Sequence, residues 1–175
     1  MSAQRAVISA VGEDRPGIVN DLTELINELE LNIDDSRMTV LGGEFAVLMS
    51  VAGEAEAIAT LEPRLAALCQ ELGLAHLFRP TTERSAATQG LPYRVRVTAM
   101  DHPGIVQRIA GFFSARQINI EDLKTETQHA AHTGTQIFNL EMKIHVPAGT
   151  GTRKLRQDFE AFCDERDLDG SLDPA

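Results

Sequence analysis

The sequence lacks the features that mark membrane and secreted proteins. No apolar run approaches the roughly 20 residues that a helix needs to cross a bilayer. The first residues, MSAQR, do not form the apolar stretch and small-residue cleavage site of a secretory signal. We therefore expect a cytoplasmic protein that makes no membrane contact.

The chain has fewer basic than acidic residues. The chain carries 16 Lys and Arg against 26 Asp and Glu, a net charge of −10. Neutralisation of phosphate supplies most of the affinity in nucleic-acid binding, so this balance disfavours direct contact with DNA or RNA. We expect no direct nucleic-acid partner.

Cysteine is scarce, and the common catalytic motifs are absent. Only Cys69 and Cys163 occur, 94 positions apart (163 − 69), and both fall on the second predicted helix of a repeated unit. This placement indicates small buried hydrophobic residues rather than a disulfide or a metal pair. The G-x-S-x-G, P-loop and Rossmann glycine patterns do not occur. We expect a protein that is not an enzyme.

One sequence motif occurs twice in the chain. The hexapeptide DRPGIV at 14–19 returns as DHPGIV at 101–106, and LNIDD at 31–35 returns as INIED at 118–122. Both pairs are offset by 87 positions (101 − 14 and 118 − 31). Two motifs that keep their distance indicate two copies of one folding unit.

Apolar periodicity predicts the same elements in each copy. In copy one we expect strands at 6–11, 33–40, 45–51 and 74–78, a helix of about four turns from Pro16, and a helix over 58–72. In copy two we expect strands at 94–99, from Ile118, at 138–144 and at 168–172, with one helix from Pro103 and a second that carries Leu155, Phe159 and Phe162. The glycine pair at 42–43 predicts a hairpin.

The order βαββαβ, given twice, predicts an α+β chain of two ferredoxin-like domains. Each would be a four-stranded antiparallel sheet with two helices on one face. We place domain 1 at 1–80 and domain 2 at 93–175. Residues 81–92, polar and bounded by Pro80 and Pro92, are expected to form a surface linker.

Each hexapeptide lies where the first strand turns into the first helix. The first N–H groups of a helix have no intrahelical partner and carry the positive end of its dipole, which suits a carboxylate. Gly17 would let a small molecule approach the main chain, and Asp14 could accept from an ammonium group. With Asn32 added, these groups suit the backbone-like atoms of a free amino acid. The alternative is a plain helix entrance, with Asp14 near the cap and Pro16 in the first turn.

With both motifs in both copies, the chain resembles the tandem ACT-domain proteins, small-molecule sensors with the βαββαβ fold. As a pair of ACT units without a catalytic or DNA-binding domain, it is similar to the glycine cleavage system transcriptional repressor family. That resemblance implies an amino-acid-sensing regulatory protein that controls transcription through a protein partner, a DNA-binding transcriptional activator. It also implies a small amino acid ligand, with glycine as the first candidate, and no other cofactor.

The resemblance implies ligand contacts where the turn of one ACT unit faces the Asn-Ile segment of another, and a homodimer is one way to supply both. The expected ligand-binding residues are Asp14, Arg15, Pro16, Gly17, Ile18, Asn32 and Ile33 in copy one, and Asp101, His102, Pro103, Gly104, Ile105, Asn119 and Ile120 in copy two.

Two other functions remain open. The chain could be a regulatory subunit that acts in trans on a metabolic enzyme, resembling the ACT portions of formyltetrahydrofolate deformylase or phosphoserine phosphatase. It could also serve only as an association module with vestigial sites.

Two short segments imitate chemical sites. The DLDGS stretch at 167–171 resembles the nucleophile loop of haloacid-dehalogenase phosphatases and the start of a calcium loop, but we interpret it as the last strand of copy two. His129 and His132 lie in an insertion found only in copy two. Because two histidines do not complete a zinc site, we interpret them as part of a hairpin tip and expect no metal.

Overall fold

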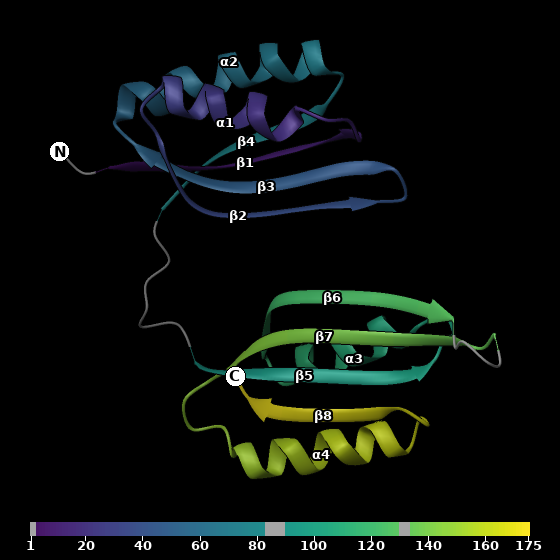
Figure 1. Ribbon diagram of the computed structural model, residues 1–175. Coiled ribbons are helices and arrows are strands. Elements are labelled where there is room, and N and C mark those ends of the chain that lie inside the picture. Colours follow the sequence, from purple (N-terminus) through teal and green to yellow (C-terminus); the bar gives the residue numbers. More distant parts are fainter. Residues whose placement is uncertain (1–2, 83–89, 130–133) are drawn as a thin grey trace. The chain divides into compact units, whose positions relative to one another are not determined.

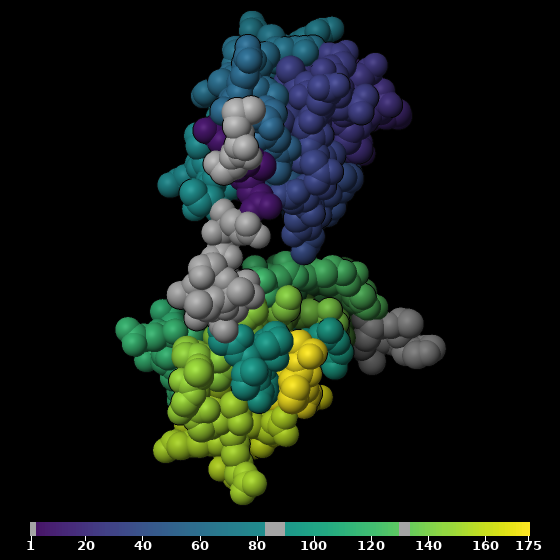
Figure 2. All heavy atoms as spheres, turned by 90° about the vertical axis from the view of Figure 1, so that its left-hand side faces the viewer, coloured from purple at the N-terminus to yellow at the C-terminus, as the bar shows by residue number. Residues whose placement is uncertain are grey.

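The chain folds into two compact units. The computed structural model describes residues 3–82, 90–129 and 134–175, and the contacts divide the chain into Met1–Arg84 (unit 1) and Ser85–Ala175 (unit 2). In the space-filling view, unit 1 runs from purple through blue and unit 2 from teal through green to yellow, and each forms a closely packed body (Figure 2).

Unit 1 is a four-stranded antiparallel sheet with two helices on one face (Figure 1). The strand order is β2-β3-β1-β4. Its elements are β1 (Gln4–Glu13), α1 (Ile18–Glu28), β2 (Asn32–Leu41), β3 (Glu44–Gly53), α2 (Ala55–Leu72) and β4 (Ala75–Thr81). The tight turn between β2 and β3 places Gly42 and Gly43 at φ 60° and 91°, the positive angles that a two-residue hairpin requires.

Unit 2 repeats this topology with the strand order β6-β7-β5-β8. Its elements are β5 (Leu91–Met100), α3 (Ile105–Ser114), β6 (Asn119–His129), β7 (Gln136–Val146), α4 (Thr152–Asp164) and β8 (Asp169–Pro174). The predicted βαββαβ order is therefore confirmed in both copies. The DLDGS stretch leads into β8, as predicted, and His132 lies outside the described residues.

Element ends differ from the sequence predictions in two ways. The first helix of unit 1 begins at Ile18 rather than Pro16 and has eleven residues, about three turns instead of four, because Gly17 adopts a left-handed conformation that a helix cannot include. Strand β4 ends at Thr81 and strand β5 begins at Leu91. Both strands therefore enter the segment 81–92, which we expected to form a linker.

The two units fill their cores with different side chains. The core of unit 1 is mainly aliphatic, with Phe45 as its one buried ring among the described residues and with residues such as Leu22, Leu61 and Leu65 at 1% exposure or less. Unit 2 instead packs four phenylalanine rings with centroids 5.0 to 6.2 Å apart, from Phe112, Phe113, Phe159 and Phe162. Such ring pairs add to the free energy gained by burying apolar area.

The cysteines pack as the sequence predicts. Cys69 and Cys163 are free thiols at 0% and 1% exposure on the inner faces of α2 and α4. Burial raises the pKa of both thiols, that of Cys163 to about 11. In the part of the chain that the structure describes, no helix is long and apolar enough to span a membrane.

Candidate functional site

The candidate site in unit 1 is the elbow between β1 and α1, residues 14–17. A main-chain bond from Asp14 N to Gly43 O, 3.0 Å long, anchors the elbow to the β2–β3 hairpin. Gly17 then turns the chain at φ 100°, a conformation that any side chain would strain. The helix begins at the next residue, Ile18.

Unit 2 builds the same elbow at residues 101–104. The bond from Asp101 N to Gln136 O is 2.9 Å, and Gly104 has φ 94°. The two elbows therefore share both their main-chain anchor and their left-handed glycine. This shared backbone geometry explains why both copies of the hexapeptide carry glycine at the fourth position.

The amino ends of α1 and α3 have no side-chain cap. Gly17 and Gly104 occupy the cap positions, and in both helices no side-chain hydrogen bond caps the first turn. The interpretation of Asp14 as an ordinary cap therefore fails, and so does the placement of Pro16 in the first turn. The free N–H groups of each first turn can receive an anionic group.

The elbows differ in the charge beside the glycine. A Cβ on Gly17 would lie 4.0 Å from Asp21 Oδ2, whereas a Cβ on Gly104 would lie 3.9 Å from Arg108 Nε. The two positions are equivalent, because 108 − 21 equals the repeat offset of 87. Sequence reasoning missed this pair, although the repeat offset could have identified it. In the elbow of unit 1 (elbow 1), the Asp21 carboxylate can therefore accept from a cationic group. In the elbow of unit 2 (elbow 2), the Arg108 guanidinium can donate to an anionic group in addition to the main-chain N–H groups.

The other predicted elbow residues take varied positions. Arg15 reaches away from its elbow and donates to Leu72 O at the end of α2, at 3.5 Å. His102 Nδ1 lies 3.1 Å from Pro103 O. Pro16 and Pro103 are exposed, while Ile18 and Ile105 are each 2% exposed and pack in the cores. Those two isoleucines can therefore offer a ligand only their main-chain N–H groups.

The predicted Asn-Ile segments lie at the opposite end of each unit. Asn32 pairs with Ala52 at the far end of β3, whereas the elbow contacts Gly43 just before β3 begins. The eleven residues of α1 separate the two by about 16 Å. One unit therefore does not bring Gly17 and Asn32 together, and the repeat gives unit 2 the same separation.

The segment after α1 is fixed by its own polar contacts. Asn32 Nδ2 donates to Asp34 Oδ1 at 2.9 Å, and Arg5 Nε donates to Asp34 Oδ2 at 3.0 Å. The register of β2 shifts between Ile33 and Asp35, so Asp34 sits in a β-bulge. Ile33 is half-buried and packs against the core.

The equivalent segment of unit 2 borders a hollow. Asn119 lines a hollow of about 400 Å³ with Ser114 and Gln117, at the end of α3. The bulge recurs between Ile120 and Asp122. Ile120 packs against the core of unit 2. This end of unit 2 thus places the polar side chains of Asn119, Ser114 and Gln117 around one hollow.

The bulge residue of unit 2 is held by two basic side chains. Lys143 Nζ lies 2.9 Å from Glu121 Oε2, and His145 Nε2 lies 2.8 Å from the same oxygen. The hydrogen bond from Lys143 is the main cause that lowers the pKa of Glu121, with a smaller contribution from His145 and opposition from burial.

The lowered pKa of Glu121 makes part of the stability of unit 2 pH-dependent. Its folded pKa lies below the ordinary value of 4.5, so its contribution is complete above that value and is lost as the pH falls through the folded pKa. We expect Glu121→Gln to be less stable than wild type at pH 7 in urea unfolding. The difference should shrink as the pH falls below 4.5. Glu126→Gln, on the same strand, controls for loss of a carboxylate, and a difference that persists at low pH would contradict the assignment.

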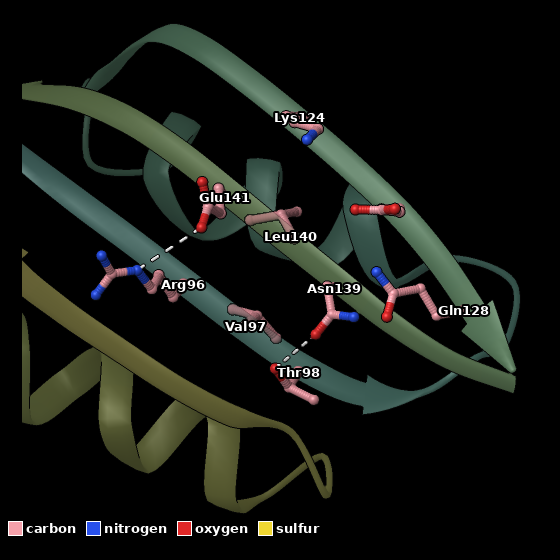
Figure 3. Close-up of a pocket in the computed structure, with 9 residues that line it drawn as sticks. Arg96, Val97, Thr98, Lys124, Gln128, Asn139, Leu140 and Glu141 are labelled. Carbon is pink, nitrogen blue, oxygen red and sulfur yellow. Dashed lines mark hydrogen bonds and ion pairs between the residues drawn. The ribbon is translucent and has the colours of Figure 1, made fainter. Parts of the chain in front are cut away.

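The outer face of the unit 2 sheet carries a shallow polar hollow of about 280 Å³ (Figure 3). Its groups partner one another, since Thr98 Oγ1 donates to Asn139 Oδ1 at 3.0 Å and Arg96 lies 3.9 Å from Glu141. Opposite charges therefore balance across this face. Among the described residues there is no group of three or more side chains that could hold a metal ion.

Comparisons with known proteins agree with this geometry. The ACT-domain family matches residues 4–79 and 93–160, one match in each unit. Together with the two βαββαβ units and their glycine elbows, these matches define a tandem ACT-domain protein.

Relatives that match nearly the whole chain identify the family within the tandem ACT-domain proteins. The chain is 34% identical over 166 residues to the glycine cleavage system transcriptional repressor of Escherichia coli (strain K12), covering 95% of this chain and 87% of that relative. A solved structure described provisionally as a glycine cleavage system transcriptional repressor is 31% identical, with a TM-score of 0.74 over 99% of this chain and 98% of that chain. An unknown protein from Galdieria sulphuraria gives a TM-score of 0.85 at 25% identity, over 99% of both chains. The chain belongs to the glycine cleavage system transcriptional repressor family.

Proposed function

We propose that this protein senses a small amino acid and controls transcription through a protein partner. Support comes from family membership, since the relative from E. coli is named a transcriptional repressor of the glycine cleavage system. The observation that carries the ligand claim is the pair of helix amino ends whose cap residues are left-handed glycines without side-chain caps. The net charge of −10 supports a protein rather than DNA as the partner.

Each elbow suits the two ends of an amino acid zwitterion. The ligand carboxylate would accept from the free N–H groups that follow Gly17 or Gly104, where the helix dipole favours negative charge. Its ammonium group would donate to Asp14 or Asp101, both of which are exposed. A small side chain such as that of glycine leaves the elbow free of steric conflict.

A complete cavity needs a second ACT unit. One unit cannot supply both Gly17 and Asn32 to a ligand, because the eleven residues of α1 hold them about 16 Å apart. The amide of Asn32 or Asn119 would therefore close an elbow that belongs to another ACT unit. A homodimer would provide such a unit in trans, and sedimentation with and without ligand would detect it.

Ligand binding would be transmitted as a change in affinity for the partner. A ligand that bridges two ACT units favours one packing of those units over others, and a partner that discriminates between packings responds to it. The partner we expect is a DNA-binding transcriptional activator in the cytoplasm. Affinity capture in the presence and absence of glycine should recover such a protein in a ligand-dependent manner.

Isothermal titration against a panel of amino acids tests the ligand claim. We expect saturable heat with a small amino acid, and weaker binding by roughly ten- to a hundredfold in the Asp14→Ala/Asp101→Ala variant, because a charged hydrogen bond is lost. The matched control is Asp35→Ala/Asp122→Ala, which removes the same charge from the exposed β2 and β6 residues. Absence of heat with every amino acid, or an equal loss of affinity in the control variant, would refute the ligand claim.

A further inference from the structure

Unit 1 has an acidic groove between its two helices. α1 and α2 lie side by side across one face of the sheet (Figure 1). The groove between them measures about 490 Å³ and has an apolar floor formed by Leu25, Leu68 and Leu72. It runs along α1, whose eleven residues span about 16 Å, or about three helical turns.

Carboxylates dominate the rim of this groove. Asp21, Glu24 and Glu28 follow one another on one side of α1, and Glu71 faces them from α2. Arg64 is the one basic residue in the lining, and it forms an ion pair with Glu28. The rim therefore keeps an excess of negative charge above an apolar floor.

The same surface of unit 2 carries arginines of its own. Arg116 stacks over the ring of Phe112 at 3.7 Å, measured from its guanidinium carbon to the ring centroid. Arg166 stacks over Phe162 at 4.2 Å. Each also donates to the main-chain oxygen of the phenylalanine that it covers, at 2.9 and 3.0 Å. Guanidinium groups thus cover the apolar floor between α3 and α4.

The repeat aligns both of these phenylalanines and Arg166 with residues that line the groove of unit 1. The offset of 87 aligns Phe112 with Leu25, and the offset of 94 between the cysteines aligns Phe162 with Leu68 and Arg166 with Leu72. Unit 1 therefore keeps the apolar floor and has Leu72 where unit 2 has Arg166, while Arg64, the guanidinium that lines its groove, is paired with Glu28. Its groove has the shape and charge to receive guanidinium groups from another molecule.

We propose that the groove between α1 and α2 binds an arginine-bearing amphipathic helix of a protein partner. A helix laid between two helices would place its apolar side on Leu68 and Leu72, which are only partly buried, and its arginines against Glu24 and Glu71. The groove also adjoins elbow 1, since Asp21 lies on its rim and near Gly17. This inference rests on the proposed function, for which it specifies the chemistry of the partner.

A synthetic peptide tests the groove with the full chain. The probe is an amphipathic helical peptide of about four turns, with leucines on one side flanked by arginines. We expect Glu24→Arg/Glu71→Arg to weaken its binding by at least about tenfold in fluorescence anisotropy. The matched control is Glu56→Arg/Glu62→Arg, which changes the net charge equally at exposed α2 positions outside the groove. That control should retain binding within about twofold.

The outcomes separate this inference from the proposed function. Absence of peptide binding to the wild type, or an equal loss in the control variant, would overturn the groove as a docking site. Conversion of a dimer to a monomer by Glu24→Arg/Glu71→Arg would assign the groove to a second copy and overturn it as well. Amino acid titration of the same variants reports on the elbow ligand alone, so a failure of the groove leaves that result standing.

Discussion

Replacing Phe159 by alanine is expected to unfold unit 2 at a much lower urea concentration and to leave unit 1 folded. Phe159 is 0% exposed and lies against Phe112 and Phe113, with centroids 5.3 and 5.4 Å away. Removal of a buried ring of this kind costs about 3–5 kcal/mol. A unit of some 80 residues has little stability to spare, so this loss should expose it selectively.

The single tyrosine makes this experiment specific. Tyr93 is the one tyrosine in the sequence, which has no tryptophan, and it packs against the core of unit 2. Its fluorescence therefore reports on unit 2, while far-ultraviolet circular dichroism reports on both units. In Phe159→Ala the fluorescence transition should move to lower urea, and the dichroism should split into two steps.

A matched substitution in unit 1 provides the control. Leu65 occupies the position equivalent to Phe159 (159 − 94) and is 1% exposed. Leu65→Ala, at a cost of about 2–5 kcal/mol, should shift the dichroism and leave the Tyr93 transition unchanged. If both probes move together in either variant, the two units unfold as one and the selective effect is refuted.

The second large effect is expected from the elbow glycines. Gly17 and Gly104 have φ of 100° and 94°, a region that an alanine enters at a cost of about 1–2 kcal/mol. A Cβ at either position has no neighbour closer than 3.9 Å, so the fold should survive. Relaxation of the strain would move the first N–H groups of each helix. We expect Gly17→Ala/Gly104→Ala to weaken amino acid binding by at least about tenfold in calorimetry.

Two other glycines make a matched control for backbone strain. Gly73 and Gly149 have φ of 72° and 87°, and a Cβ added at either position would meet no neighbour within 4 Å. The double variant Gly73→Ala/Gly149→Ala should lose comparable stability and keep wild-type amino acid affinity. Equal affinity losses in the two double variants would show that the elbows have no special part in binding.

The sequence predicted the topology because the signals were repeated. Apolar alternation and helical periodicity appear in both copies at fixed offsets, so an ambiguous strand in one copy could be read from the other. The hairpin at Gly42 and Gly43 and the burial of Cys69 and Cys163 followed from the same evidence. These features depend on local conformation or on periodic burial, which a sequence carries directly.

The conformation of the elbow could not be derived in this way. A Pro-Gly pair is compatible with a helix that begins at the proline or after the glycine, and only the left-handed φ of Gly17 decides between them. The repeat offset pairs Asp21 with Arg108, so the sequence contains the charge difference between them. Only the structure shows that both side chains lie beside an elbow glycine. The bulges at Asp34 and Glu121 have no sequence signature in the alternation pattern.

The central claim is that the free N–H groups of the elbows hold the carboxylate of an amino acid. Titration of ¹⁵N-labelled protein with glycine, followed by amide chemical shifts, tests it most directly. We expect saturable shifts centred on Ile18, Val19 and Asn20, on the equivalent residues 105–107, and on Asn32 or Asn119. Saturable shifts confined to other surfaces, or no shifts with any small amino acid, would contradict it.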